Sequence, residues 1–293
     1  MSRAQLLLLV LLALGKVGLA DDRPVNYAPS PTYGPSQANA DLEVAAASCH
    51  EAHFQNDEAV ANALRSGDTD QILQVIAEAL DVWRATSETS ALYPARTFCI
   101  HELVPRYLQG TDVPGHDSDE ARQPTPTVRQ FQQLGISYWY YVYDGDWVLE
   151  NPVDLMDFAM KHLNSRWGRE AFLMMTKLGW SLGNCHEGAD YQFREVIRRG
   201  EEFLKTYPES ETSNSIRFEV ASAYATWWTL SASPTPERYK QGGETARERA
   251  IELYQQYIEH QKAPNRYVEN DVKALQARRP FRQIDYHCED YED

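Results

Sequence analysis

Residues 203–230, "FLKTYPESETSNSIRFEVASAYATWWTL", contain the pattern that decides the fold. Pro208 ends one predicted helix, because proline lacks an amide hydrogen and does not continue a helix. After a polar turn, apolar and aromatic residues return at the three- and four-residue spacing of a single helix face. The stretch therefore predicts two helices joined by a short turn, and the apolar face of the second comprises Ile216, Val220, Ala223, Tyr224 and Trp227.

Helical spacing continues on both sides of this stretch. A first helix follows Asn151, and we expect further helices at residues 168–183, 190–207, 213–230 and 244–261. The segment 136–152, "ISYWYYVYDGDWVLENP", is the least helical, and its aromatic residues and its "DGD" fit a β-hairpin, although two helices flanking a turn also fit. We predict one helical domain over residues 131–293, with an acidic C-terminal tail.

Three pieces of this domain, within residues 190–262, resemble a tetratricopeptide-repeat (TPR) segment of the helical-hairpin type common in exported bacterial proteins. In repeat order they are Phe203, Leu204, Tyr207, Pro208 and Ser210; then Ala221, Ala223 and Tyr224; then Ala250, Tyr254, Tyr257 and Ile258. Small residues let paired helices approach, and aromatic residues fill the groove between them. The loop at 231–243 is longer than a repeat turn, and no second copy follows at a 34-residue period, so the repeats are divergent. The resemblance implies a mainly α fold of helical hairpins, stacked as a degenerate TPR-like solenoid or bundle, that binds a protein and has no catalytic residue.

The part of the chain before this domain divides into four segments. Residues 1–20, "MSRAQLLLLVLLALGKVGLA", combine a short basic start, an apolar run and small residues at the end, as a secretory signal peptide does. Residues 21–40 are rich in Pro, Ser, Ala and Asn and predict a flexible leader. Residues 41–108 predict a small helical unit, and the proline-rich residues 109–130 predict a linker. We therefore expect an exported protein of the periplasm or the extracellular space.

The charge of the chain excludes some partners. It has 43 acidic and 28 basic residues, a formal charge of −15, which repels nucleic acid and anionic membranes. After the signal peptide no apolar run is long enough to span a membrane, and no cysteine stands where a lipid anchor would be attached. We expect a protein or peptide partner, no nucleic acid, no membrane span and no lipid anchor.

The four cysteines predict two disulfides. An even number of cysteines in an exported chain favours pairing over a free thiol. The sequence alone leaves three pairings open, and we favour Cys49–Cys99 with Cys185–Cys288, because each bond then closes a loop within one predicted domain.

The stretch "CHEAH" at 49–53 raises the question of a metal site. His50 and His53 share a helix face, and His101 is close to Cys99, which is predicted to pair with Cys49. However, a zinc peptidase needs H-E-x-x-H, and "HEAH" is one residue short. We therefore predict no metal, no cofactor and no catalytic residue, and keep His50, His53 and His101 as candidates for an alternative, a secreted metal-dependent hydrolase.

Aromatic residues supply the candidates for partner binding. Trp227 continues the inward face of its helix, so the adjacent Trp228 is either at a second interface or exposed, and we select it as a partner contact. Arg238 and Tyr239, on the long insertion, are expected to close over the same surface. We predict a non-catalytic scaffold that binds a protein or peptide; a further alternative is a structural accessory subunit of a bacterial envelope assembly.

Overall fold

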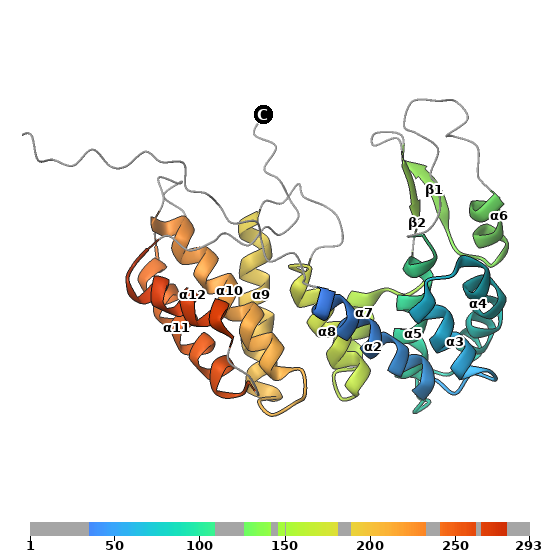
Figure 1. Cartoon of the computed structure of the whole chain (residues 1–293), viewed down its shortest axis with the longest axis horizontal. Coiled ribbons are helices and arrows are strands. Elements are labelled where there is room, and N and C mark those ends of the chain that lie inside the picture. Colours follow the sequence, from blue (N-terminus) through green and yellow to red (C-terminus); the bar gives the residue numbers. More distant parts are fainter. Residues whose placement is uncertain are drawn as a thin grey trace, which may run out of the picture. The chain divides into compact units, whose positions relative to one another are not determined.

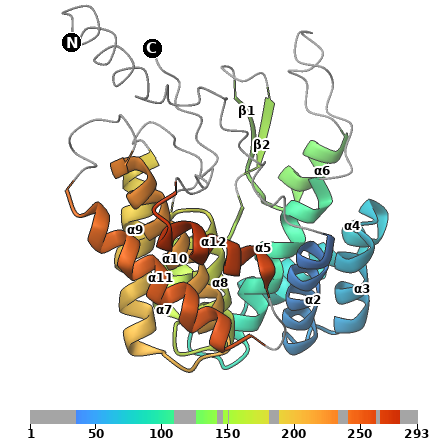
Figure 2. The ribbon, with the colours of Figure 1, turned by 60° about the vertical axis from the view of Figure 1, so that its left-hand side comes forward.

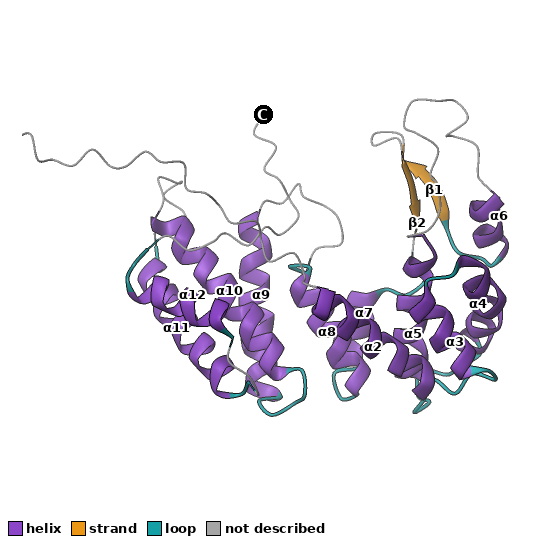
Figure 3. Cartoon of the chain, viewed as in Figure 1, coloured by secondary structure: helices purple, strands orange, loops and turns teal. Residues whose placement is uncertain are grey.

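The computed structural model of the chain describes residues 35–108, 126–141, 146–149, 151–180, 189–232, 241–261 and 265–279. In these ranges the protein is mainly helical (Figure 1; Figure 3). All of them belong to one compact unit, Pro31–Asp293, whereas the second unit, Met1–Ser30, lies outside the described residues. The predicted signal peptide therefore also lies outside them.

Four helices form the N-terminal part of the described chain. They are α2 (Pro35–Glu51), α3 (Asp57–Ser66), α4 (Thr69–Arg84) and α5 (Tyr93–Leu108). The first differs from the sequence prediction, because the leader expected to be flexible over residues 21–40 is helical from Pro35 onward. Proline is well suited to the first position of a helix, and an alanine-containing stretch follows it.

The ends of α3 and α4 follow the local sequence signals. Gly67 ends α3 in the left-handed conformation with φ 64°, and Asp68 accepts hydrogen bonds from the amides of Asp70 and Gln71. Gln71 in turn donates its side-chain amide to the Asp68 carboxylate, whereas the Asp68 amide donates to Ser66 Oγ at 3.0 Å, so the reciprocal bond of a capping box is not made. Asn56 precedes α3, but its side chain makes no capping hydrogen bond.

Helix α6 (Pro126–Gln133) precedes two strands, β1 (Tyr138–Tyr141) and β2 (Asp146–Leu149). The strands pair antiparallel, with Tyr138 opposite Leu149 and Tyr141 opposite Asp146. Of the two readings of segment 136–152, the β-hairpin is therefore confirmed. The linker prediction is wrong at its end, since residues 126–130 are helical; its earlier residues lie outside the described ranges.

The described residues after β2 contain six helices: α7 (Leu155–Lys161), α8 (Arg166–Lys177), α9 (Ala189–Thr206), α10 (Ser213–Ala232), α11 (Gly243–Glu259) and α12 (Arg266–Gln276). Helix α7 starts after Asp154, whose side chain caps it, and not directly after Asn151. Helix α8 is shorter than the predicted helix 168–183, because Gly179 and Trp180 both take positive φ values, 66° and 60°.

Helix α10 packs against α9 on one side and α11 on another, and both views show the three side by side (Figure 1; Figure 2). The α9–α10 approach is close at Gly200, where an added Cβ would be 2.2 Å from Val220 Cγ2. Because two neighbours cover it, α10 is buried around most of its circumference. Buried apolar residues from Ala45 to Leu275 form one continuous core. No helix in the described ranges is both long and apolar enough to cross a membrane.

Candidate functional site

Helices α2 and α8 are joined by side chains at both ends. At one end Trp167 Nε1 donates to Glu51 Oε2 at 2.9 Å, and Arg166 Nη1 donates to Glu51 Oε1 at 3.3 Å. At the other end Lys177 Nζ pairs with Asp41 Oδ1 at 3.3 Å. The end of α2 therefore lies beside the start of α8, so the two helices run antiparallel. The two links are separated by about 15 Å along each helix.

A cavity of 280 Å³ lies between these helices and α5. Each helix contributes one face, because the lining residues recur at intervals of three and four. The floor is apolar: Phe98 is only 2% exposed, whereas Leu178 at the rim is 42% exposed. The residues that line the cavity are Asp41, Val44, Phe98, Glu102, Glu170, Leu173, Met174, Lys177 and Leu178.

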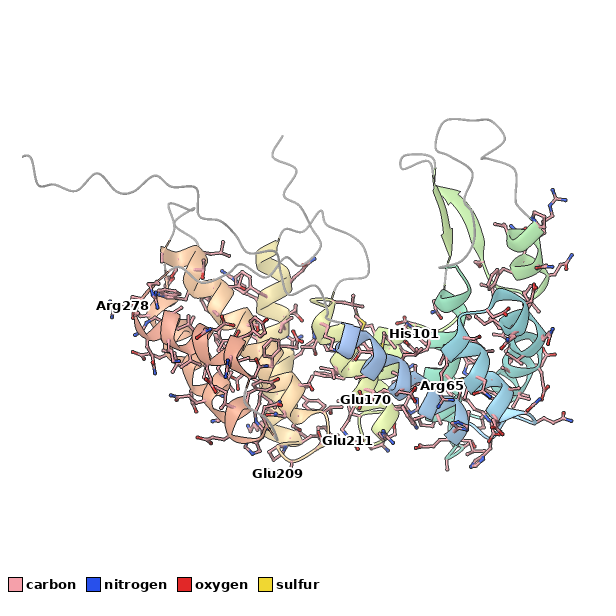
Figure 4. All side chains as sticks on the ribbon, in the orientation of Figure 1. Arg65, His101, Glu170, Glu209, Glu211 and Arg278 are labelled. Atoms are coloured by element: carbon pink, nitrogen blue, oxygen red, sulfur yellow. A yellow bond between two sulfur atoms is a disulfide. The ribbon has the colours of Figure 1, made fainter. Side chains whose placement is uncertain are left out.

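The charges around this cavity are mostly negative. Asp41, Glu102 and Glu170 supply carboxylates, and Lys177 supplies one ammonium group. Asp41 is paired with Lys177, and Glu102 Oε1 is 2.9 Å from His101 Nδ1. Figure 4 labels His101 on α5 and Glu170 on α8.

Two carboxyl groups in this region have raised pKa values. Burial raises the pKa of Glu170, Glu211 and Asp41 raise it further, and Arg166 and Lys177 act in the opposite direction. Burial also raises the pKa of Glu219 on α10 to about 7, where Lys177 opposes the effect and Asp41 adds to it. Of these two residues, Glu170 lines the cavity, and a titratable group with a perturbed pKa in a cleft is a candidate for a functional role.

A disulfide holds two of the three helices that line the cavity. Cys49 on α2 and Cys99 on α5 form the predicted bond, with an S–S distance of 2.09 Å, and both are fully buried. The bond is adjacent in sequence to Phe98, so it fixes α5 against α2 behind the apolar floor. The prediction of Cys185–Cys288 falls on residues outside the described ranges.

Comparisons with known proteins give no relative for this arrangement. The chain matched no protein-family model, no curated protein and no solved structure. The site must therefore be interpreted from its own residues.

The three candidate histidines do not come together. His50 is exposed in the last turn of α2, and His53 follows it with φ 49° in an exposed turn whose carbonyl accepts a hydrogen bond from Arg96. The imidazole of His101 is engaged with Glu102. Among the residues that the structure describes, no three His, Cys, Asp or Glu side chains are grouped as metal ligands would be.

The structure corrects the choice of Trp228 as a partner contact. Trp228 is 4% exposed, since α10 is covered by helices on two sides and both of its apolar faces are buried. Trp227 is half-buried and stacks near Tyr224, with ring centroids 6.5 Å apart. Arg238 and Tyr239 lie outside the described residues.

Sequence reasoning missed the cavity, although a signal for it exists in α8. Glu170, Leu173, Met174 and Lys177 follow the spacing of one helix face, so two charged residues stand in line with apolar ones. A charge within an apolar stripe is unexpected unless it is paired or faces a cavity. The partner faces from α2 and α5 were not predictable from spacing, because nothing in the sequence places them beside α8.

Proposed function

We propose that this protein is a non-catalytic helical scaffold that binds a protein or peptide partner through the α2–α5–α8 cavity. The cavity is the observation that carries the proposal: it joins an apolar floor to a few polar groups, the combination typical of binding sites. Its volume of 280 Å³ is below the range of about 300–1,000 Å³ usual for sites that enclose a whole small molecule. It therefore fits a side chain inserted by a larger partner better than a free ligand.

The helical architecture supports the same proposal. Consecutive helices contact each other in pairs, including α7 with α8, α9 with α10 and α10 with α11. This pattern is consistent with the divergent TPR-like hairpins that the sequence resembles, and stacked hairpins of that kind present extended binding surfaces. The buried Cys49–Cys99 disulfide suits an oxidising compartment and so supports export to the periplasm or the extracellular space.

A peptide array tests the proposal directly. The full chain, purified with its disulfide intact and labelled, is applied to immobilised random nonapeptides. We expect a reproducible subset to bind, and we expect Met174→Trp to abolish that binding because the indole fills the cavity that Met174 lines.

The matched control is Met160→Trp. Met160 is 44% exposed on α7 and does not line the cavity, so this variant should bind the same peptides as the unmodified chain. Thermal unfolding of both variants checks that each is folded. Binding by no peptide at all, or equal binding by a folded Met174→Trp, would show that the proposal is wrong.

A further inference from the structure

The carboxylates around the cavity are not matched by an equal number of cations. Lys177 is the basic residue among those that line it, whereas Asp41, Glu102 and Glu170 are acidic. The Lys177–Asp41 pair uses that ammonium group at 3.3 Å. Glu102 is held by a histidine, which is charged only when it is protonated. Glu170 therefore faces the cavity with a charge that its own helix and its neighbours leave largely uncompensated.

From this imbalance we propose that the partner inserts a basic side chain, arginine or lysine, flanked by an apolar residue, into the cavity, where its cationic group meets Glu170 and Glu102. The inference rests on the proposed function and specifies the chemistry of the partner. An arginine or lysine suits both parts of the site, because its alkyl stem packs on apolar surface while its charged end reaches carboxylates. Phe98, Leu173 and Met174 supply that surface.

The pKa shifts of the neighbouring carboxyl groups are consistent with the binding of a basic side chain. The pKa of Glu170 is raised by burial first, then by Glu211 and Asp41, and the cations Arg166 and Lys177 do not outweigh these effects. Glu219, which interacts with the same Lys177 and Asp41, has a pKa of about 7 for the same primary reason. A bound cation would favour the ionised form of Glu170, so binding should release protons wherever this carboxyl group is partly protonated.

The partner's charge also suits the whole chain. The formal charge of −15 repels acidic segments and attracts basic ones over distances comparable with the screening length of about 10 Å at 0.1 M salt. A basic segment is therefore both steered toward the protein and accepted at the cavity.

A matched pair of peptides tests the inference on the unmodified protein. Arginine-containing binders from the array are resynthesised with citrulline, which keeps the shape of arginine and removes its charge. Affinity is measured by fluorescence anisotropy at pH 8. We expect the citrulline peptide to bind at least about 10-fold more weakly, the usual effect of losing a charged hydrogen bond.

Substitutions in the protein test whether Glu170 makes the contact with the arginine side chain. Glu170→Gln should weaken the arginine peptide about 10-fold and leave the citrulline peptide unchanged, because the lost contact needs both charges. Glu248→Gln, an exposed change on α11, should alter neither. For the unmodified chain, affinity for the arginine peptide should be lower at acidic pH than at pH 8, because the raised pKa of Glu170 keeps this carboxyl group protonated and uncharged to a higher pH than usual.

The outcomes separate the two proposals. Equal affinity for arginine and citrulline peptides, or array binders without any arginine or lysine, would overturn this inference while the scaffold function stands. Failure of every peptide to bind in a cavity-dependent way would overturn both. Retention of full arginine affinity in Glu170→Gln would also reject the proposed contact.

Discussion

Single carboxyl groups should give this protein an unusual dependence of stability on pH. Burial raises the pKa of Glu219 to about 7, above the ordinary value of 4.5, so the folded chain holds this proton more tightly than the unfolded chain does. The stabilisation is complete at pH values below 4.5 and is lost as the pH rises toward and through 7. This contribution is opposite in sign to that of a salt-bridged carboxylate.

We predict that Glu219→Gln removes part of this pH dependence. The free energy of unfolding of the unmodified chain should fall between pH 5 and pH 8, and in the variant it should fall by less. The difference should be at most about 3 kcal/mol, and smaller if water reaches the half-buried carboxyl group. Urea titrations at four pH values measure it, with Glu248→Gln as an exposed control. Parallel curves for Glu219→Gln and the unmodified chain would contradict the assignment.

One indole nitrogen should contribute measurably to the α2–α8 contact. Trp167 is 3% exposed and donates its Nε1 hydrogen to Glu51 at 2.9 Å. Trp167→Phe keeps an aromatic ring against Phe98 but removes the donor, so we predict a loss of about 1–3 kcal/mol in the free energy of unfolding.

The control for Trp167→Phe changes the other partner. Glu51→Gln keeps an oxygen that accepts the indole hydrogen but removes the charge that Arg166 also uses. It should therefore cost less than Trp167→Phe in chemical denaturation. If Trp167→Phe differed from the unmodified chain by less than about 0.5 kcal/mol, the hydrogen bond would not be an important link.

At the scale of elements, the close packing of α9 against α10 depends on a glycine, Gly200, which has no side chain. An added Cβ at Gly200 would lie 2.2 Å from Val220 Cγ2, well inside contact distance. We predict that Gly200→Ala destabilises the protein by about 1–3 kcal/mol despite the better helix propensity of alanine. Thermal and chemical unfolding measure the effect.

A second substitution tests the cause of that effect. In the double variant Gly200→Ala/Val220→Ala the space for the methyl group is restored, so the two changes should be less costly together than their sum. Glu202→Ala, at an exposed position of α9, controls for alanine in this helix. If the losses in stability from the two substitutions were strictly additive, the contact between residue 200 and Val220 would not explain why alanine is unfavourable at this position.

The disulfide should be the strongest single link between α2 and α5. The two cysteines are 50 positions apart in sequence, and closing a loop of this length stabilises a folded chain by about 4 kcal/mol in the chain-entropy treatment. We predict a loss of this order in Cys49→Ala/Cys99→Ala, measured by urea titration, and weaker peptide binding at the adjacent cavity. An unchanged midpoint would show that the packed core alone fixes these helices.

Local signals in the sequence predicted elements better than they predicted neighbours. The helices around Val60, Ile216 and Leu253, the Asp68 cap and the hairpin at 136–152 depend on residues close together in the chain, and those were predictable. The end of α8 was missed, because Trp180 adopts a positive φ that a tryptophan rarely takes and that only the surrounding structure imposes. Helix α12 was not anticipated, since the last predicted helix ended at residue 261.

The candidate site was less predictable from the sequence than the helices were. Among the three possible pairings of the four cysteines, Cys49–Cys99 was predicted because it closes a loop within one predicted domain. The cavity was not predictable, because it depends on how α2, α5 and α8 are placed relative to one another. The spacing of apolar residues within a helix carries no information about that placement. Trp228 failed for a related reason: its exposure depended on whether a second helix covers α10, and α11 does.

At the scale of the whole molecule, the contacts that frame the cavity also connect the helices before the predicted linker with α8, which follows it. The predicted linker at 109–130 separates two helical parts in sequence, but Phe98 of α5 contacts Trp167 of α8 with ring centroids 5.4 Å apart. Asn151 donates to the His101 carbonyl at 3.0 Å, and Lys177 pairs with Asp41. Binding at the cavity would therefore act on both parts together.

We predict that these parts unfold in a single cooperative transition. The ion pairs Lys177–Asp41 and Arg166–Glu51 that link them are exposed, but Phe98 and Trp167 are buried. Separation of α8 from α2 and α5 would therefore expose these two rings to water at a cost of about 1.5–3 kcal/mol for each. Urea unfolding followed by far-ultraviolet circular dichroism and by tryptophan fluorescence should give coincident curves. The variant Asp41→Asn/Phe98→Ala weakens the junction and should broaden or split the transition, whereas Glu58→Gln on the exposed face of α3 should not. Two separate transitions in the unmodified chain would mean that the junction is too weak to couple the parts, and a partner bound at the cavity would then be expected to restore the coupling.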